Sequence, residues 1–126
     1  MILCDTNVLV EFLKNNPQVT AELRAIGQND LAISVITLAE LYFGAFNKAE
    51  LIKIKRNLSP LAQLPITRTA SDTFIHLMET YSLSHKPSLP DMLIAATALE
   101  HNIELYTFNR KDFRFIPGLR LYQPAV

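Results

Sequence analysis

Acidic residues stand beside apolar segments at four places in this sequence: Asp5, Glu40, Asp91 and Asp112. Segments this apolar are expected to enter one core, so the four carboxylates should lie close together. Two such charges about 5 Å apart repel by about 3 kcal/mol at an effective dielectric of 20, so a cluster without a base needs a cation. Oxygen ligands select a hard ion such as Mg²⁺ or Mn²⁺. Because such an ion activates water and neutralises phosphoryl charge, the pattern predicts hydrolysis of a phosphodiester.

The segment around Glu40, residues 35–46, reads VITLAELYFGAF and is apolar on nearly every side. A helix of this kind is expected to be buried, and a buried carboxylate is costly unless a cation or hydrogen-bond donors meet it. The alternative interpretation puts Glu40 on a narrow solvent-exposed stripe with Thr37 and Gly44. The two interpretations predict opposite exposure for the Glu40 side chain.

The other three acids have a simpler interpretation, which stays open at this stage. Asp5 and Asp91 stand where helices are expected to begin, and an aspartate there commonly caps a helix or faces its positive end. Asp112 lies in a polar segment and fits an ordinary turn. On this hypothesis the chain is a binding protein that takes up neither Mg²⁺ nor Mn²⁺.

The elements that would position these acids alternate between strands and helices. Strands are expected over residues 1–4, 31–33, 64–66, 104–108 and 119–122. Helices are expected over residues 8–13, from Pro17 to a cap at Gly27, 35–46 after a Ser34 cap, Lys48–Leu58, 70–81 after a Thr69 cap, and 90–101. Short strands that are apolar on both sides are typical of a parallel sheet with helices on both faces. Ligands bind beyond the carboxyl ends of such strands, which is where Asp5, Asn109 and Asp112 stand.

Length and composition limit the classes of protein that this chain can be. Its 126 residues fit a single α/β domain over 1–126 with a sheet of about four to five strands. Twelve basic and twelve acidic residues cancel, which argues against a generally basic nucleic-acid-binding protein. The single cysteine, Cys4, excludes a disulfide scaffold and a Cys-rich zinc site. With no apolar run long enough to span a bilayer and no signal peptide at the start, we expect a cytoplasmic protein.

Four short motifs, in order along the chain, resemble those of the PIN-domain family. They are DTNVL at residues 5–9, AEL at 39–41 followed by Gly44, PDMLIAA at 90–96 and TFNRKDF at 107–113. Each motif alone is weakly specific, but the four together span nearly the whole chain. The length is similar to that of the VapC-type toxins within this family.

The resemblance implies a PIN-like three-layer fold and a Mg²⁺-dependent endoribonuclease that acts as the toxin of a toxin–antitoxin pair, with Mn²⁺ able to replace Mg²⁺. The family's catalytic acids correspond to Asp5, Glu40, Asp91 and Asp112. We expect Asp5 and Asp91 to bind the metal directly, and Glu40 and Asp112 to reach it through water. The polar residues that steady the acids correspond to Thr6, Thr107 and Asn109. Asn109 can also supply a neutral oxygen in place of Asp112.

The implied partners are RNA, an antitoxin protein and a second copy of the chain. Arg110 and Lys111 are candidates for contacts with RNA phosphates. Residues 38–46 and the helix face of Leu51, Ile54 and Leu58 offer more apolar surface than a small sheet covers. We expect part of it to form a groove for an amphipathic antitoxin segment that inserts a basic side chain among the acids. Apolar surface on other helices is expected to close a homodimer.

A phosphotransfer module is the remaining alternative, with Asp5 as the phosphoacceptor after a strand. Such modules need a second acid next to or two residues after the first, and here the second position after it is Asn7, which argues against this reading. The three histidines, His76, His85 and His101, have no zinc-ligand spacing and receive no catalytic role.

Overall fold

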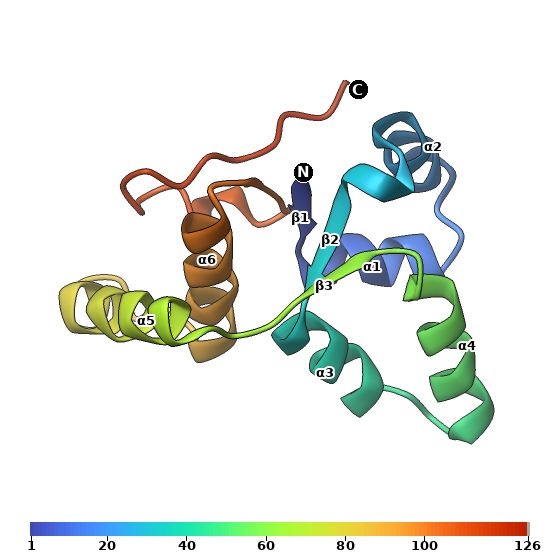
Figure 1. The fold of residues 1–126 in the computed structure, drawn as a ribbon, viewed down its shortest axis with the longest axis horizontal. Helices are drawn as coiled ribbons and strands as arrows, with labels where there is room; N and C mark the ends of the chain where they lie inside the picture. Colours follow the sequence, from blue (N-terminus) through green and yellow to red (C-terminus); the bar gives the residue numbers. More distant parts are fainter. Residues whose placement is uncertain (126) are drawn as a thin grey trace.

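The computed structural model describes residues 1–125, and a four-stranded parallel sheet with the order β3-β2-β1-β4 forms its centre (Figure 1). The strands are β1 (Ile2–Cys4), β2 (Leu31–Ser34), β3 (Ala62–Leu64) and β4 (Glu104–Tyr106). The helices are α1 (Thr6–Leu13), α2 (Pro17–Ile26), α3 (Val35–Phe43), α4 (Lys48–Leu58), α5 (Arg68–Tyr81) and α6 (Leu89–His101). Two short 3₁₀ turns are η1 (Gln28–Asp30) and η2 (Arg110–Asp112). The predicted parallel α/β sheet is confirmed.

Successive side chains of the strands point to opposite faces of the sheet, and both faces are buried. One face packs against α5 and α6, and the other against α1, α2 and α4 (Figure 1). The first face presents Leu3, Ala32 and Leu105, and the second presents Cys4, Ile33 and Tyr106. The fold therefore has three layers, as predicted.

The order of the strands creates the edge at which a site can form. From β1 the chain moves outward to β2 and β3, and then returns to place β4 on the other side of β1. Cys4 pairs with Tyr106, and the next amide, Asp5 N, donates to the Tyr106 carbonyl at 2.9 Å. The residues that follow β1 and β4 thus lie side by side where the strand order reverses, which is the usual position of a ligand in such sheets.

Several helix boundaries follow directly from capping residues. Asn16 accepts from the amides of Gln18 and Val19 at the start of α2, and Gly27 ends that helix with a φ of 92°. Ser34 caps α3 as predicted. The predicted Thr69 cap of α5 is wrong, because Thr67 Oγ1 accepts from Ala70 N at 3.0 Å and α5 begins at Arg68. Helix α3 ends at Phe43, three residues before its predicted end, with Gly44 as its C-cap.

Three predicted strands have different limits in the structure. Strand β3 covers Ala62–Leu64 rather than 64–66, since Pro65 has no N–H to donate to a neighbouring strand. Strand β4 stops at Tyr106, because Thr107 turns toward Asp5. The predicted strand at 119–122 is wrong, and this segment meets the sheet only through an isolated bridge between Leu105 and Leu121.

The C-terminal segment crosses the molecule toward α2 (Figure 1). There Glu22 accepts hydrogen bonds from the Tyr122 hydroxyl and, at 3.1 Å, from Ala125 N. This contact fastens the end of the described chain to the α2 side of the sheet. Among residues 1–125 no helix has the length and apolar character needed to cross a membrane.

Candidate active site

Three of the four singled-out acids line one cavity where β1 and β4 end. This acidic cavity has a volume of about 530 Å³, and Asp5, Glu40 and Asp91 contribute to its wall. Thr6 and Asn109 line it as well. No lysine or arginine of the described chain lines it. The structure therefore gathers carboxylates in one place without a neutralising base.

Asp5 is almost fully buried, with 4% of its surface exposed, and each of its carboxylate oxygens has one donor. Thr6 N donates to Oδ1 at 2.8 Å, and Thr107 Oγ1 donates to Oδ2 at 2.7 Å. Asp5 is also the N-cap residue of α1. The capping interpretation and the active-site interpretation are thus both compatible with this residue, since a carboxylate oxygen accepts more than one hydrogen bond.

Asp91 lies in the first turn of α6, where Ser88 is the N-cap and its Oγ accepts from Asp91 N at 3.1 Å. Burial raises the pKa of the Asp91 carboxyl to about 6, and the nearby charge of Asp5 adds to this effect. The Ser88 side chain, as a hydrogen-bond partner of the Asp91 carboxyl itself, opposes the rise. Asp91 therefore holds a proton more readily than an ordinary aspartate does.

The electrostatics of Asp5 show that the acids interact. Burial raises the pKa of Asp5 most, and the charges of Glu40 and Asp112 raise it further. The hydrogen bonds from Thr107 and Thr6 lower it. Asp112 and Glu40 raise the pKa of Asp91 in the same way. Three of the four acids thus share one cavity, and Asp112, which lines the neighbouring cavity, is near enough for its charge to act on Asp5 and Asp91.

The prediction that Glu40 is buried is wrong, because its side chain is exposed. The last turn of helix α3 is buried on one side only: Leu41 packs into the core, whereas Phe43 is 94% exposed. The proposed solvent stripe is also wrong in part, since Thr37 is fully buried. Glu40 is nevertheless held at the cavity, because Thr6 Oγ1 donates to its Oε1 at 2.8 Å. Thr6 Oγ1 also lies 3.1 Å from Thr37 Oγ1, which connects Glu40 to the buried start of α3.

The two candidates for the fourth position of the site, Asn109 and Asp112, both lie after β4 but line different cavities. Asn109 lines the acidic cavity, and its backbone N donates to Thr107 Oγ1 at 3.0 Å. Asp112 lines a neighbouring cavity, which shares Asp91 with the first. Lys111 lines that neighbouring cavity too. Arg110 directs its guanidinium elsewhere and donates to the Tyr122 carbonyl at 3.2 Å.

The chemistry of the donors fits a hydrated hard cation. Among residues 1–125 no three His, Cys, Asp or Glu side chains are grouped closely enough to hold a metal ion by themselves. A cation in the acidic cavity would therefore contact only one or two carboxylates directly and complete its shell with water. Mg²⁺ retains several waters in most of its protein sites, whereas zinc in structural sites takes four protein ligands.

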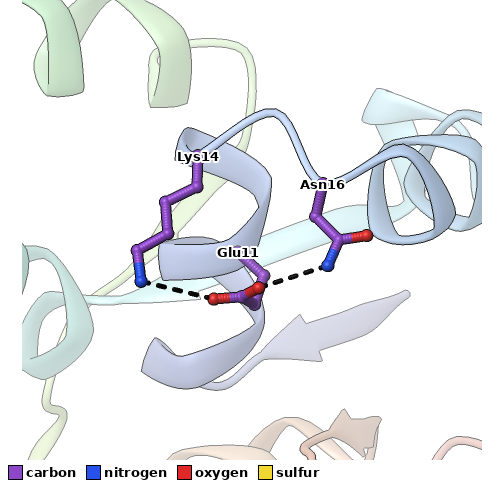
Figure 2. A network of polar contacts seen from close by, with 3 residues as sticks. All are labelled: Glu11, Lys14 and Asn16. Carbon is purple, nitrogen blue, oxygen red and sulfur yellow. Dashed lines mark hydrogen bonds and ion pairs between the residues drawn. The ribbon is translucent and has the colours of Figure 1, made fainter.

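Sequence reasoning missed two residues on the wall of the acidic cavity. Asn7 Oδ1 accepts from Phe108 N at 3.3 Å and so ties α1 to the segment after β4. Glu11 follows Asn7 by one helical turn, and this spacing was the available signal. Figure 2 shows the Glu11 carboxylate between Lys14 Nζ at 3.6 Å and Asn16 Nδ2 at 3.2 Å. Glu11 pairs with a cationic lysine, whereas the donors to Asp5 are neutral, so Glu11 differs from Asp5 in having its charge balanced.

Comparisons with known proteins match nearly the whole chain. The family model described as PIN domain matches residues 2–119. The chain is 30% identical over 125 residues to "Ribonuclease VapC1" of Haemophilus influenzae (strain R2866), which covers 94% of this chain and 93% of that protein. It is 27% identical to "tRNA(fMet)-specific endonuclease VapC" of Salmonella typhimurium, over 94% of both proteins. The solved structure of VapBC2 from Rickettsia felis bound to a promoter DNA fragment is similar, with a TM-score of 0.84, 29% identity and coverage of 97% of this chain and 98% of that chain.

Proposed function

The chain belongs to the PIN-domain family, and from this we propose that it is a divalent-metal-dependent endoribonuclease, the toxin of a toxin–antitoxin pair. The observation that carries the proposal is the cavity in which Asp5, Glu40 and Asp91 meet without a lysine or arginine on its wall. A cavity with this charge excludes an RNA phosphate unless a cation is present. With RNA as substrate, the expected place of action is the cytoplasm.

Mg²⁺ is the proposed ion, with Mn²⁺ able to replace it and with Asp5 and Asp91 as its direct protein ligands. Glu40 and Asp112 are assigned to its water ligands. A bound divalent cation lowers the pKa of water and neutralises charge on the phosphoryl oxygens. Thr107 and Thr6 hold the Asp5 oxygens in place, which fixes the direction of the free lone pairs.

RNA cleavage in the presence and absence of metal tests the proposed function. We expect the purified chain to cut single-stranded RNA with Mg²⁺ or Mn²⁺, and to stop when EDTA removes the ion. Asp5→Asn should be inactive with either ion, while Asp72→Asn, an exposed acid on α5, should retain wild-type activity as the matched control. Cleavage that continues unchanged in EDTA would refute the metal-dependent mechanism.

The antitoxin site proposed for this chain is a groove of about 630 Å³ between α1, α3 and α4. Phe46, which is 90% exposed, lines this groove together with Val10. Glu40 and Thr6 line both the groove and the acidic cavity, so a segment bound in the groove can direct a basic side chain to the acids. An arginine there would supply the positive charge that the cation otherwise provides.

The apolar face of α4 was expected to add exposed surface to the antitoxin groove, but it exposes less than predicted. Ile54 and Leu58 are 6% and 3% exposed and pack into the core, while Leu51 is half-buried. Apolar surface on the opposite side of the molecule remains for a second copy of the chain. Ile75 on α5 is 52% exposed, and Leu83 in the α5–α6 connection is 89% exposed. We propose that this surface closes the homodimer.

A further inference from the structure

A second cavity, of about 290 Å³, adjoins the acidic cavity and shares Asp91 with it. It lies between the connection from α5 to α6, the start of α6, and η2. Its wall includes His85, Lys86, Asp91, Lys111, Asp112 and Phe115. The function proposed above uses only Asp91 and Asp112 of these residues, and gives no role to the others.

The two cavities differ in charge. The acidic cavity has no lysine or arginine on its wall, whereas Lys86 and Lys111 stand beside the acids of the second cavity. Neither ammonium takes part in an ion pair within the described part of the chain. An RNA strand carries one phosphate per nucleotide, so the phosphates next to the cleaved one need cationic partners of their own. The second cavity, next to the acidic cavity, supplies such cationic partners through Lys86 and Lys111.

Aromatic rings form one wall of the second cavity. The His85 ring stacks on the Phe115 ring with a centroid distance of 4.1 Å and an angle of 20°. Tyr81 contacts both rings edge-on, at 5.4 Å and 4.9 Å. Ser84 Oγ lies 2.7 Å from His85 Nδ1, which fixes the orientation of the ring in its plane. His85 is therefore a held ring that is still exposed, a combination that suits stacking with a nucleobase.

The backbone at Lys86 gives independent support for a role of its side chain. Its φ is 48°, in the left-handed region that residues with a Cβ rarely adopt. Glycine or asparagine would adopt this conformation at a lower cost in free energy, so stability of the fold does not explain a lysine here. Strained positions of this kind concentrate at functional sites.

From these observations we propose that the second cavity binds the RNA strand beside the cleaved phosphodiester. In this arrangement Lys86 binds a backbone phosphate and His85 stacks with a base. Lys111 faces the same phosphate path. The inference rests on the proposed ribonuclease function. It assigns to the RNA strand a path that leads from the acidic cavity, past Asp91, into the second cavity.

Lys86→Gly tests the phosphate contact without damage to the fold. Because glycine relieves the positive φ, the thermal midpoint should stay equal or rise. Loss of the ammonium should raise KM for cleavage of single-stranded RNA about tenfold with little change in kcat. The slope of log affinity against log salt should fall by about 0.7, the value for one phosphate contact on a single strand. Lys55→Ala, an exposed lysine on α4, is the matched control and should change neither quantity.

A pair of substitutions at His85 tests the stacking contact. We would measure binding by the fluorescence anisotropy of a fluorescein-labelled single-stranded RNA of about ten nucleotides, using the inactive Asp5→Asn chain as background. His85→Ala should weaken binding about 5- to 100-fold, whereas His85→Phe, which keeps a flat ring, should retain most of the affinity. Equal loss in both variants would refute stacking.

The outcomes separate this inference from the proposed function. If the wild-type chain cleaves RNA and Lys86→Gly leaves KM and the salt slope unchanged, the second cavity is not an RNA site and the ribonuclease proposal stands. If the wild-type chain fails to cleave RNA, the proposed function fails, and the anisotropy measurement still decides whether Lys86 and His85 bind RNA. Loss of antitoxin affinity in Lys86→Gly, with RNA binding intact, would also overturn the inference.

Discussion

Asp5 and Asp91 hold a proton more readily in the folded chain than in the unfolded chain, because burial and the neighbouring acids raise the pKa of both. In the unfolded chain an aspartate has a pKa of about 3.9, while the folded Asp91 has a pKa of about 6. Below about pH 4 the folded and unfolded states both hold the proton. Between about pH 4 and pH 6 the unfolded state loses it first, so the stabilising contribution of protonated Asp91 declines and is lost above its folded pKa.

The first prediction follows from this sign. In EDTA, the free energy of unfolding of the wild-type chain should fall between about pH 4 and pH 7 by more than that of Asp91→Asn, which has no titrating carboxyl at this position. Urea unfolding followed by circular dichroism at several pH values measures the difference. Parallel curves for the two proteins would mean that Asp91 does not carry a raised pKa.

The second prediction concerns Glu40. Because its side chain is exposed, a substitution there can change activity without a large change in stability. Glu40→Gln keeps the oxygen that accepts from Thr6 and removes the charge, so the free energy of unfolding should change little. If the Glu40 carboxylate orients water on a cation, its neutralisation should lower the kcat of the chain about 10- to 100-fold. Wild-type activity of Glu40→Gln would place this residue outside the active site.

The positions of the acids were predictable at this scale, but their surroundings were not. Asp5 directly follows an apolar strand, and a parallel sheet puts such residues at a common edge. The hydroxyl contacts from Thr6 to Thr37 and the amide contact from Phe108 to Asn7 depend on how α1, α3 and the segment after β4 pack. No local pattern in the sequence encodes distances between residues that are far apart in the chain.

Helix α3 shows, at the scale of elements, why a hydrophobic pattern predicts burial but not the partner that provides it. Residues 35–46 are apolar nearly throughout, yet Leu41 is buried in the core while Phe43 and Phe46 are 94% and 90% exposed. Exposed apolar patches of this kind are typical of protein interfaces. Helix α2 was predicted closely because Pro17 and Gly27 are local boundary signals, and α4 because Leu51, Ile54 and Leu58 repeat at helical spacing.

The third prediction concerns the groove between α1, α3 and α4. Phe46→Ala should weaken antitoxin binding by on the order of 2 kcal/mol, because aromatic side chains at the centre of an interface carry much of its affinity. RNA cleavage by the free chain should remain at the wild-type level. Isothermal titration with the purified antitoxin measures the affinity, and Leu83→Ala, an equally exposed residue away from the groove, is the control. If both variants bind the antitoxin as the wild type does, the groove is not its site.

At the scale of the whole molecule, the fourth prediction concerns the second copy of the chain. Sedimentation at micromolar concentration should give a dimer for the wild-type chain and a monomer for Ile75→Glu. In a symmetric dimer each of the two copies would bring its own glutamate into the apolar interface. Phe46→Glu, on the opposite side, should remain a dimer. A wild-type monomer would refute the homodimer, and a dimeric Ile75→Glu would move the interface to another surface.

The account depends most directly on cation binding by the acidic cavity. Titration of Mn²⁺ into the metal-free chain, followed calorimetrically at pH 7, should show binding to the wild-type protein and to the exposed-acid control Asp72→Asn. Asp5→Asn and Asp91→Asn should each lose that binding while they keep a folded circular dichroism spectrum, and removal of a repelling charge should leave their metal-free stability equal or higher. Binding of Mn²⁺ to Asp5→Asn and Asp91→Asn with wild-type affinity would contradict the assignment of these acids to the metal.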